Sequence, residues 1–97
     1  MENEKLINEL KAVGFHNVTP MMLAKEVRTG HSVIVESYED KSLMIANCYY
    51  DENHSIEWRK HPVFRGFIET KEDMVKFATV LNLEPEGREA FYALTNF

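Results

Sequence analysis

The sequence has little of what cross-links a chain or holds it in a membrane. Its 97 residues include one cysteine, Cys48, so an intramolecular disulfide is excluded and a reducing compartment is favoured. No apolar run approaches the roughly 20 residues that a membrane-spanning helix needs. The first residues, Met1 to Lys5, are acidic and polar and do not have the pattern of a secretory signal. We therefore expect a cytoplasmic protein that does not associate with membranes.

Motifs for cofactors, metals and catalysis are also missing. The four glycines are too far apart to cradle a phosphate, and there is no Gly-x-Ser-x-Gly motif. The nearest pair of potential zinc ligands, Cys48 and His54, has five residues between them and no second pair follows. We interpret Cys48 as a small buried apolar residue and the histidines as surface or turn residues. The sequence thus indicates no cofactor, no metal ligands and no catalytic residue.

An excess of basic residues is absent as well. The chain has 11 basic and 16 acidic side chains, which gives a formal net charge of −5. Broad binding to DNA or RNA depends on neutralising phosphates, so this balance disfavours it. An acidic surface remains suited to a basic partner. The content of 44% hydrophobic and 28% charged residues is that of an ordinary folded domain.

The first third of the chain predicts two helices. Residues 3–13 have apolar side chains at helical spacing, Gly14 follows as a stop, and Phe15 is expected to pack back on the helix end. Residues 19–29 are predicted as the second helix, because Thr19 suits an N-cap and Pro20 the first helical position.

The middle of the chain predicts strands. Residues 32–38 hold a β-branched run, and residues 43–50 are apolar on both faces, as in a central strand covered on both sides. Residues 55–60 form a third strand, which makes an antiparallel meander the simplest arrangement. Pro62 is expected to break the ladder, and residues 63–68 to form a fourth, irregular strand with a bulge at Gly66.

The last third predicts two more helices. Residues 70–82 carry an apolar stripe, and Thr70 with Asp73 resembles a capping box. The final helix starts near Pro85. The prediction is a single α+β domain over residues 1–97, with two N-terminal helices, a meander of three or four strands and two C-terminal helices.

Two groups of side chains are candidates for binding. Aromatic residues gather in the strand region and would form a protein-binding or self-association surface if the helices leave a sheet face open; they are Tyr38, Tyr49, Tyr50, Trp58 and Phe64. A basic and aromatic segment, residues 58–65, offers Arg59, Lys60 and Arg65 to a nucleic acid.

The function we infer from these patterns is a non-catalytic protein-binding module, such as a small regulator or inhibitor. Small acidic α+β proteins without motifs are common among phage and mobile-element accessory genes. We expect a protein partner, with self-association through the sheet as one form of it. The first alternative is a nucleic-acid-binding protein that uses the segment 58–65. The second is a small enzyme whose site is assembled from residues distant in sequence.

Overall fold

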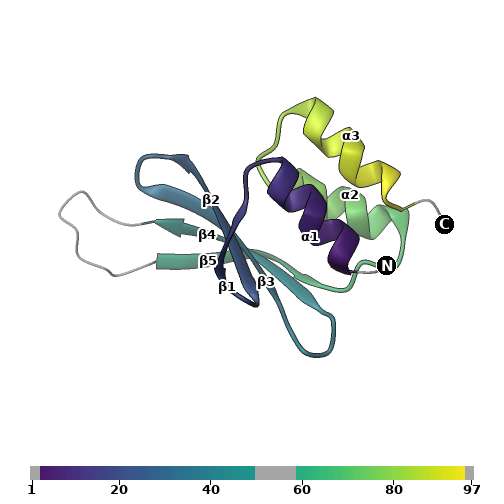
Figure 1. Ribbon diagram of the computed structural model, residues 1–97, viewed down its shortest axis with the longest axis horizontal. Coiled ribbons are helices and arrows are strands. Elements are labelled where there is room, and N and C mark those ends of the chain that lie inside the picture. The colour runs from purple at the N-terminus through teal and green to yellow at the C-terminus, as the bar shows by residue number, and fades with distance from the viewer. Residues whose placement is uncertain (1–2, 50–58, 96–97) are drawn as a thin grey trace.

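The computed structural model describes residues 3–49 and 59–95, and these form three helices and five strands (Figure 1). The order along the chain is α1 (Asn3–Ala12), β1 (His16–Thr19), β2 (Met22–Arg28), β3 (His31–Ser37), β4 (Leu43–Tyr49), β5 (Arg59–Gly66), α2 (Lys71–Thr79) and α3 (Pro85–Ala93). Each strand pairs antiparallel with the next, which gives one sheet in the order β1-β2-β3-β4-β5. The predicted α+β meander is confirmed, with one N-terminal helix instead of two.

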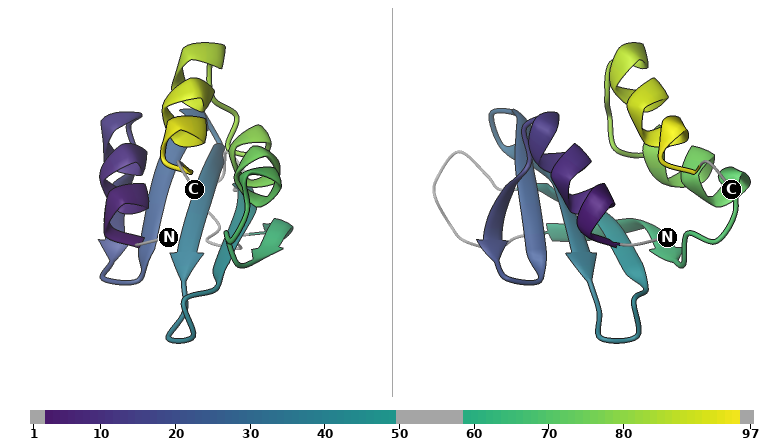
Figure 2. Two further views of the ribbon diagram at one scale, coloured as in Figure 1. Left: turned by 90° about the vertical axis from the view of Figure 1, so that its right-hand side faces the viewer. Right: turned by 45° about the vertical axis from the view of Figure 1, so that its right-hand side comes forward.

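All the described helices lie on one face of the sheet. Figure 2 shows α1, α2 and α3 in front of the same strands, and α3 contacts both α1 and α2. The opposite face carries no helix of the described chain, and we call it the helix-free face. Most residues of β4 are buried on both faces, as the sequence predicts for a central strand. The strand is central, between β3 and β5, but helices cover it on one side alone.

The first helix ends as the sequence predicts. Gly14 has a φ of +105°, a left-handed conformation that glycine adopts without a Cβ clash. The N–H of Phe15 donates to the carbonyl of Leu10 at 3.0 Å, and the N–H of Gly14 donates to that of Lys11 at 3.1 Å. These two bonds form a Schellman motif, whose usual apolar contact is supplied here by Phe15 and Leu10 in the core.

The prediction of a helix over residues 19–29 is wrong. Thr19 and Pro20 begin a tight turn between β1 and β2, in which the Thr19 hydroxyl accepts from the N–H of Met21 at 3.2 Å. Proline suits the second position of such a turn as well as the first turn of a helix. Leu23 and Val27 are four residues apart, a spacing that puts them on one side of either a helix or a strand. Tertiary pairing with β3 selects the strand.

The prediction that Pro62 breaks the ladder is also wrong. The strand β5 runs through Pro62 to Gly66 as the outermost strand of the sheet, where a missing N–H is tolerated. Ile45 pairs with Phe64 and Ala46 with Pro62, so the bulge lies at Val63 and not at Gly66. Most of the predicted strand over residues 55–60 lies outside the described residues.

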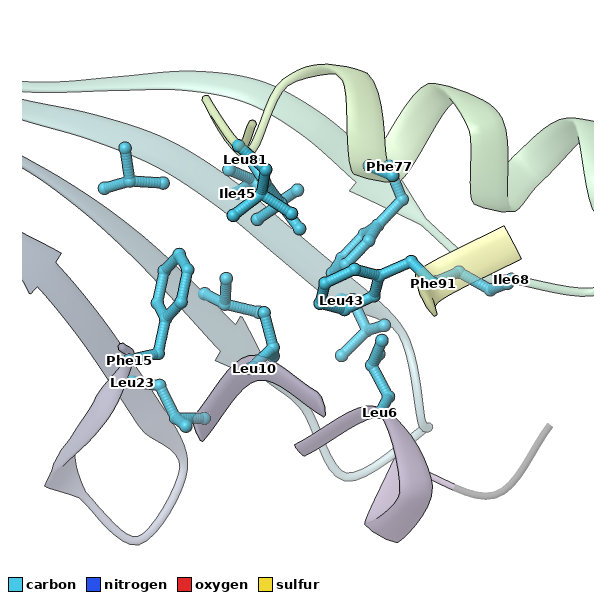
Figure 3. Close-up of a cluster of buried hydrophobic side chains, with 14 of the residues drawn as sticks. Leu6, Leu10, Phe15, Leu23, Leu43, Ile45, Ile68, Phe77, Leu81 and Phe91 are labelled. Atoms are coloured by element: carbon cyan, nitrogen blue, oxygen red, sulfur yellow. The ribbon is translucent and has the colours of Figure 1, made fainter. Parts of the chain in front are cut away.

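The main core fills the space between the sheet and the helices. Figure 3 shows Leu6 and Leu10 of α1, Phe77 of α2 and Phe91 of α3 gathered over Leu43 and Ile45 of β4. Their side chains are completely or almost completely buried. The ring of Phe64, from β5, meets Phe77 edge-on with 5.4 Å between centroids. One core is therefore shared by apolar residues from the first helix, the meander and the two C-terminal helices.

The predicted capping box of α2 is confirmed. The Thr70 hydroxyl accepts from the N–H of Asp73 at 3.2 Å, and the Asp73 carboxylate accepts from the N–H groups of Thr70 and Glu69, each at 2.9 Å. The last helix is also confirmed, with Pro85 at its first position.

The core and the cap differ in how much stability they supply. Phe77→Ala removes a fully buried ring and should lower the free energy of unfolding by about 3–5 kcal/mol. Thr70→Ala removes one capping acceptor and should cost about 1 kcal/mol. Urea unfolding of both variants measures the two values, and equal small losses would show that α2 is peripheral to stability.

The capping carboxylate also predicts a pH dependence. Hydrogen bonds from the backbone of Glu69 and Thr70 lower the pKa of Asp73 below its usual value of about 3.9. The folded state therefore favours the carboxylate, and its stabilisation is present above about pH 4 and lost as the pH falls through the lowered pKa. We expect Asp73→Asn to be less stable than wild type near pH 7, with the difference shrinking in acid. Glu72→Gln, which leaves the capping box intact, is the control in the same urea titrations.

Candidate functional site

The helix-free face of the sheet carries a second, smaller apolar cluster. Alternate residues of β3 and β4 point away from the helices, and four apolar ones among them are buried: Ile34, Met44, Ala46 and Cys48. Met22, Ala24 and Tyr38 pack around them. No described helix covers this cluster, and these side chains of the sheet and the β3–β4 connection supply part of its cover.

Long polar side chains supply part of that cover. Lys60 of β5 reaches Glu36 of β3 with 3.7 Å between the charged atoms. The register pairs Lys60 with Cys48 and Glu36 with Met44, so this contact crosses β4 diagonally. The Tyr38 hydroxyl donates to Glu36 at 2.6 Å, and the Arg65 guanidinium lies 5.1 Å from the centre of the Tyr38 ring. The bond to Glu36 and partial burial raise the pKa of Tyr38. The four side chains form what we call the polar strap.

Beside the polar strap lies an open apolar groove of ≈ 400 Å³. It is lined by one residue or more from each strand, namely Val18, Thr19, Met22, Ala24, Ile34, Cys48 and Lys60. Val18 is 56% exposed, and Met21, in the turn that joins β1 to β2, is 44% exposed. An apolar hollow with exposed apolar residues at its border has the composition of a binding surface. We call this feature the apolar groove.

The floor of the apolar groove includes the thiol of Cys48. Burial raises the pKa of this thiol, with a smaller opposing effect from Lys60. A thiol held in its neutral form is a poor nucleophile. The expected burial of Cys48 is confirmed, and its chemical surroundings suit packing better than reaction.

A second feature lies on the opposite, helix-covered face, near the end of the sheet. His31 begins β3 and is 7% exposed, which corrects its interpretation as a surface or turn residue. Its Nε2 lies 2.8 Å from the amide oxygen of Asn47 on the neighbouring strand. Its ring stacks on Tyr49 with 4.6 Å between centroids and 19° between planes. The other ring nitrogen, Nδ1, is buried without a hydrogen-bond partner among the described residues.

An open pocket of ≈ 290 Å³ adjoins this histidine, and we call it the His31 pocket. Its lining comes from the β2–β3 turn, from β4 and β5 and from the end of α2; it comprises Arg28, His31, Asn47, Val63, Thr79, Val80 and Asn82. Val63 reaches it because the bulge leaves that residue without a register partner. Asn82 follows α2 in a left-handed conformation, with a φ of 60°, that asparagine tolerates.

The aromatic residues predicted to form one surface lie in different surroundings. Phe64 packs in the main core against Phe77. Tyr38 belongs to the polar strap on the helix-free face, whereas Tyr49 stacks on His31 and lies edge-on to His61. Tyr50 and Trp58 fall outside the described residues. The structure therefore does not bring the described members together.

Two of the three cations proposed for nucleic-acid binding, Lys60 and Arg65, belong to the polar strap. Lys60 is paired with Glu36, and Arg65 lies over Tyr38. The side chain of Arg59 falls outside the described residues, and its backbone pairs with Tyr49 at the start of β5. Cations already engaged with an acid or a ring are less available to phosphate.

The sequence analysis missed both the apolar groove and the His31 pocket. The misassigned helix hid the β2–β3 hairpin, whose turn at Thr29 and Gly30 makes Arg28 and His31 cross-strand partners. Gly30 has a φ of +81°, a left-handed conformation that closes this turn. If residues 22–28 had been predicted as a strand, the sequence would have indicated that Arg28 and His31 are cross-strand neighbours.

Residues 3–49 and 59–95 contain no group of three or more histidine, cysteine or acidic residues that could hold a metal ion. None of the helices in this part of the chain combines the length and the apolar character that crossing a membrane requires. Comparison of the chain with protein-family models, curated proteins and solved structures finds no match.

The thiol provides a direct check on the helix-free face. We expect Cys48 to react slowly with a thiol reagent in the native protein and rapidly after denaturation, because burial limits access and raises its pKa. Timed labelling followed by mass spectrometry measures both rates. Native labelling as fast as that of the denatured chain would contradict the buried position of Cys48.

Proposed function

We propose that this protein is a non-catalytic protein-binding module that receives an amphipathic helix of a partner in the apolar groove. The observation that carries the proposal is an apolar hollow on the one sheet face that no described helix covers. Sheets in small domains bury an apolar face against helices or another sheet. A partner helix would do on this face what α1, α2 and α3 do on the other.

A helix suits this surface better than an added strand. Strand addition needs a free, regular sheet edge. At one edge, β5 contains Pro62 and a bulge. At the other edge, β1 has four residues and an irregular register, and the Asn17 amide donates to the Thr19 carbonyl at 3.3 Å. Both edges thus carry the features that proteins use to prevent edge pairing.

Charge favours a partner helix with a basic polar side. The chain has a net charge of −5, which speeds the approach of a positively charged partner at low salt. Lys60, at the border of the apolar groove, is already paired with Glu36 and adds little opposing charge. The binding energy would come mainly from apolar contacts at Val18, Met22 and Ile34, and the charges would mainly set the association rate.

A photocrosslinking experiment tests this proposal. A benzophenone amino acid replaces Val18 at the apolar groove or, as a matched control, Val75 on α2, which is an exposed valine on the helix side. We expect one protein to crosslink in the source cells from position 18 and not from position 75. The crosslinked segment, made as a peptide, should become helical on binding.

Point variants then measure the contribution of the surface. Val18→Asp places a charge against the apolar side of the partner helix, so it should weaken binding of that peptide by about tenfold or more. Val75→Asp makes the same chemical change outside the groove and should leave the affinity unchanged. Thermal unfolding of each variant checks that the fold is intact. Crosslinks from position 18 only to a second copy of the chain, or peptide binding that both variants weaken equally, would refute the proposal.

A further inference from the structure

The orientation of the His31 ring is set by two contacts at once. Its face stacks on Tyr49, and its Nε2 meets the Asn47 amide oxygen at 2.8 Å. An amide oxygen accepts hydrogen bonds, so Nε2 carries the proton and Nδ1 of the neutral ring has a free lone pair. Turning the ring to pair Nδ1 would sacrifice the contacts that hold it.

Nδ1 is therefore an acceptor that lacks a donor inside a protein. More than nine-tenths of His31 is buried, and Nδ1 has no partner among the described residues. A buried polar group without a partner is costly, and such groups recur where a ligand supplies the missing bond. His31 also lines the adjoining His31 pocket, so a ligand held there lies beside its ring.

The charge of the other residues that line the His31 pocket favours a ligand with an anionic group next to that donor. Among the described lining residues Arg28 is the one with a permanent charge, and no carboxylate opposes it. Arg28 and His31 are cross-strand partners, whose Cβ atoms are typically about 5 Å apart. The guanidinium is suited to pairing with a carboxylate.

The end of α2 favours a donor on the other side of the ligand. Thr79 is the last residue of this helix and Val80 its C-cap, and both line the pocket. The C-terminus of a helix carries partial negative charge and attracts N–H, O–H or ammonium groups. The Thr79 hydroxyl already donates to the Val75 carbonyl at 2.6 Å, so its remaining lone pair also accepts.

We propose that the His31 pocket binds a small carboxylate whose adjacent carbon bears a hydrogen-bond donor, either a hydroxyl or an ammonium group. Arg28 holds the carboxylate, and Nδ1 of His31 accepts from the donor. This site is separate from the apolar groove, since it lies on the other face of the sheet.

Three probes that differ by one group test the proposal: acetate, glycolate and glycine. Titration of the full chain, followed by backbone amide chemical shifts, gives a dissociation constant for each. We expect glycolate or glycine to bind about fivefold or more tightly than acetate, because each can donate to Nδ1. If glycolate binds more tightly than glycine, the natural donor is a hydroxyl. If glycine binds more tightly, the natural donor is an ammonium group.

Variants separate the two halves of the site. His31→Gln keeps an N–H for Asn47 and removes the Nδ1 acceptor, so it should abolish the preference over acetate while acetate binding persists. Arg28→Gln should weaken all three probes, and Arg65→Gln, a charge-matched control on the helix-free face, should change none. If His31→Gln does not fold, the ¹⁵N shift of Nδ1 in the wild type should move with glycolate or glycine and stay with acetate. Acetate binding as tightly as both other probes, a preference that survives His31→Gln, or no saturable shift with any probe would overturn the proposal.

Discussion

The placement of every described helix on one face of the sheet is the constraint on which the rest of the structure depends. A five-stranded meander has two faces, and β4 carries apolar residues toward both. On one side the helices bury them. On the other side, side chains of the sheet itself supply part of the cover. Neighbouring strands are about 4.8 Å apart, so β3 and β5 lie about 10 Å from each other. Lys60 pairs with Cys48 and Glu36 with Met44, so these two long side chains meet diagonally across β4.

The polar strap works through coverage more than through charge. An ion pair of 3.7 Å whose two side chains are 41% and 20% exposed contributes little Coulombic energy in water. The methylene stem of Lys60 and the ring of Tyr38 cover apolar surface instead. This cover stops short of Val18 and Met22, and the apolar groove is the uncovered remainder. The exposed apolar surface at that place follows from the layering, without any motif in the sequence.

Local signals predicted the parts of the fold that local interactions decide. The capping box at Thr70, the Gly14 stop and the Pro85 start depend on bonds within a few residues, and all are present. The segment 19–29 failed because Thr-Pro begins helices and turns alike, and because the spacing of Leu23 and Val27 fits both periods. Pairing with β3, which is not local, decided between them. Neither the apolar groove nor the His31 pocket could be placed before that pairing was known, since each needs β2 as a strand.

The two sites share strands but not faces. His31 and Asn47 face the helices, and their chain neighbours Ser32 and Cys48 face the opposite way. Such closeness does not by itself couple the sites. Coupling requires a structural element with two arrangements that both ligands bias. The strands β3 and β4 are paired without interruption from His31 and Tyr49 to Ser37 and Leu43, and such a ladder offers one arrangement. This ladder therefore supplies no element through which ligands at the two proposed sites would be coupled.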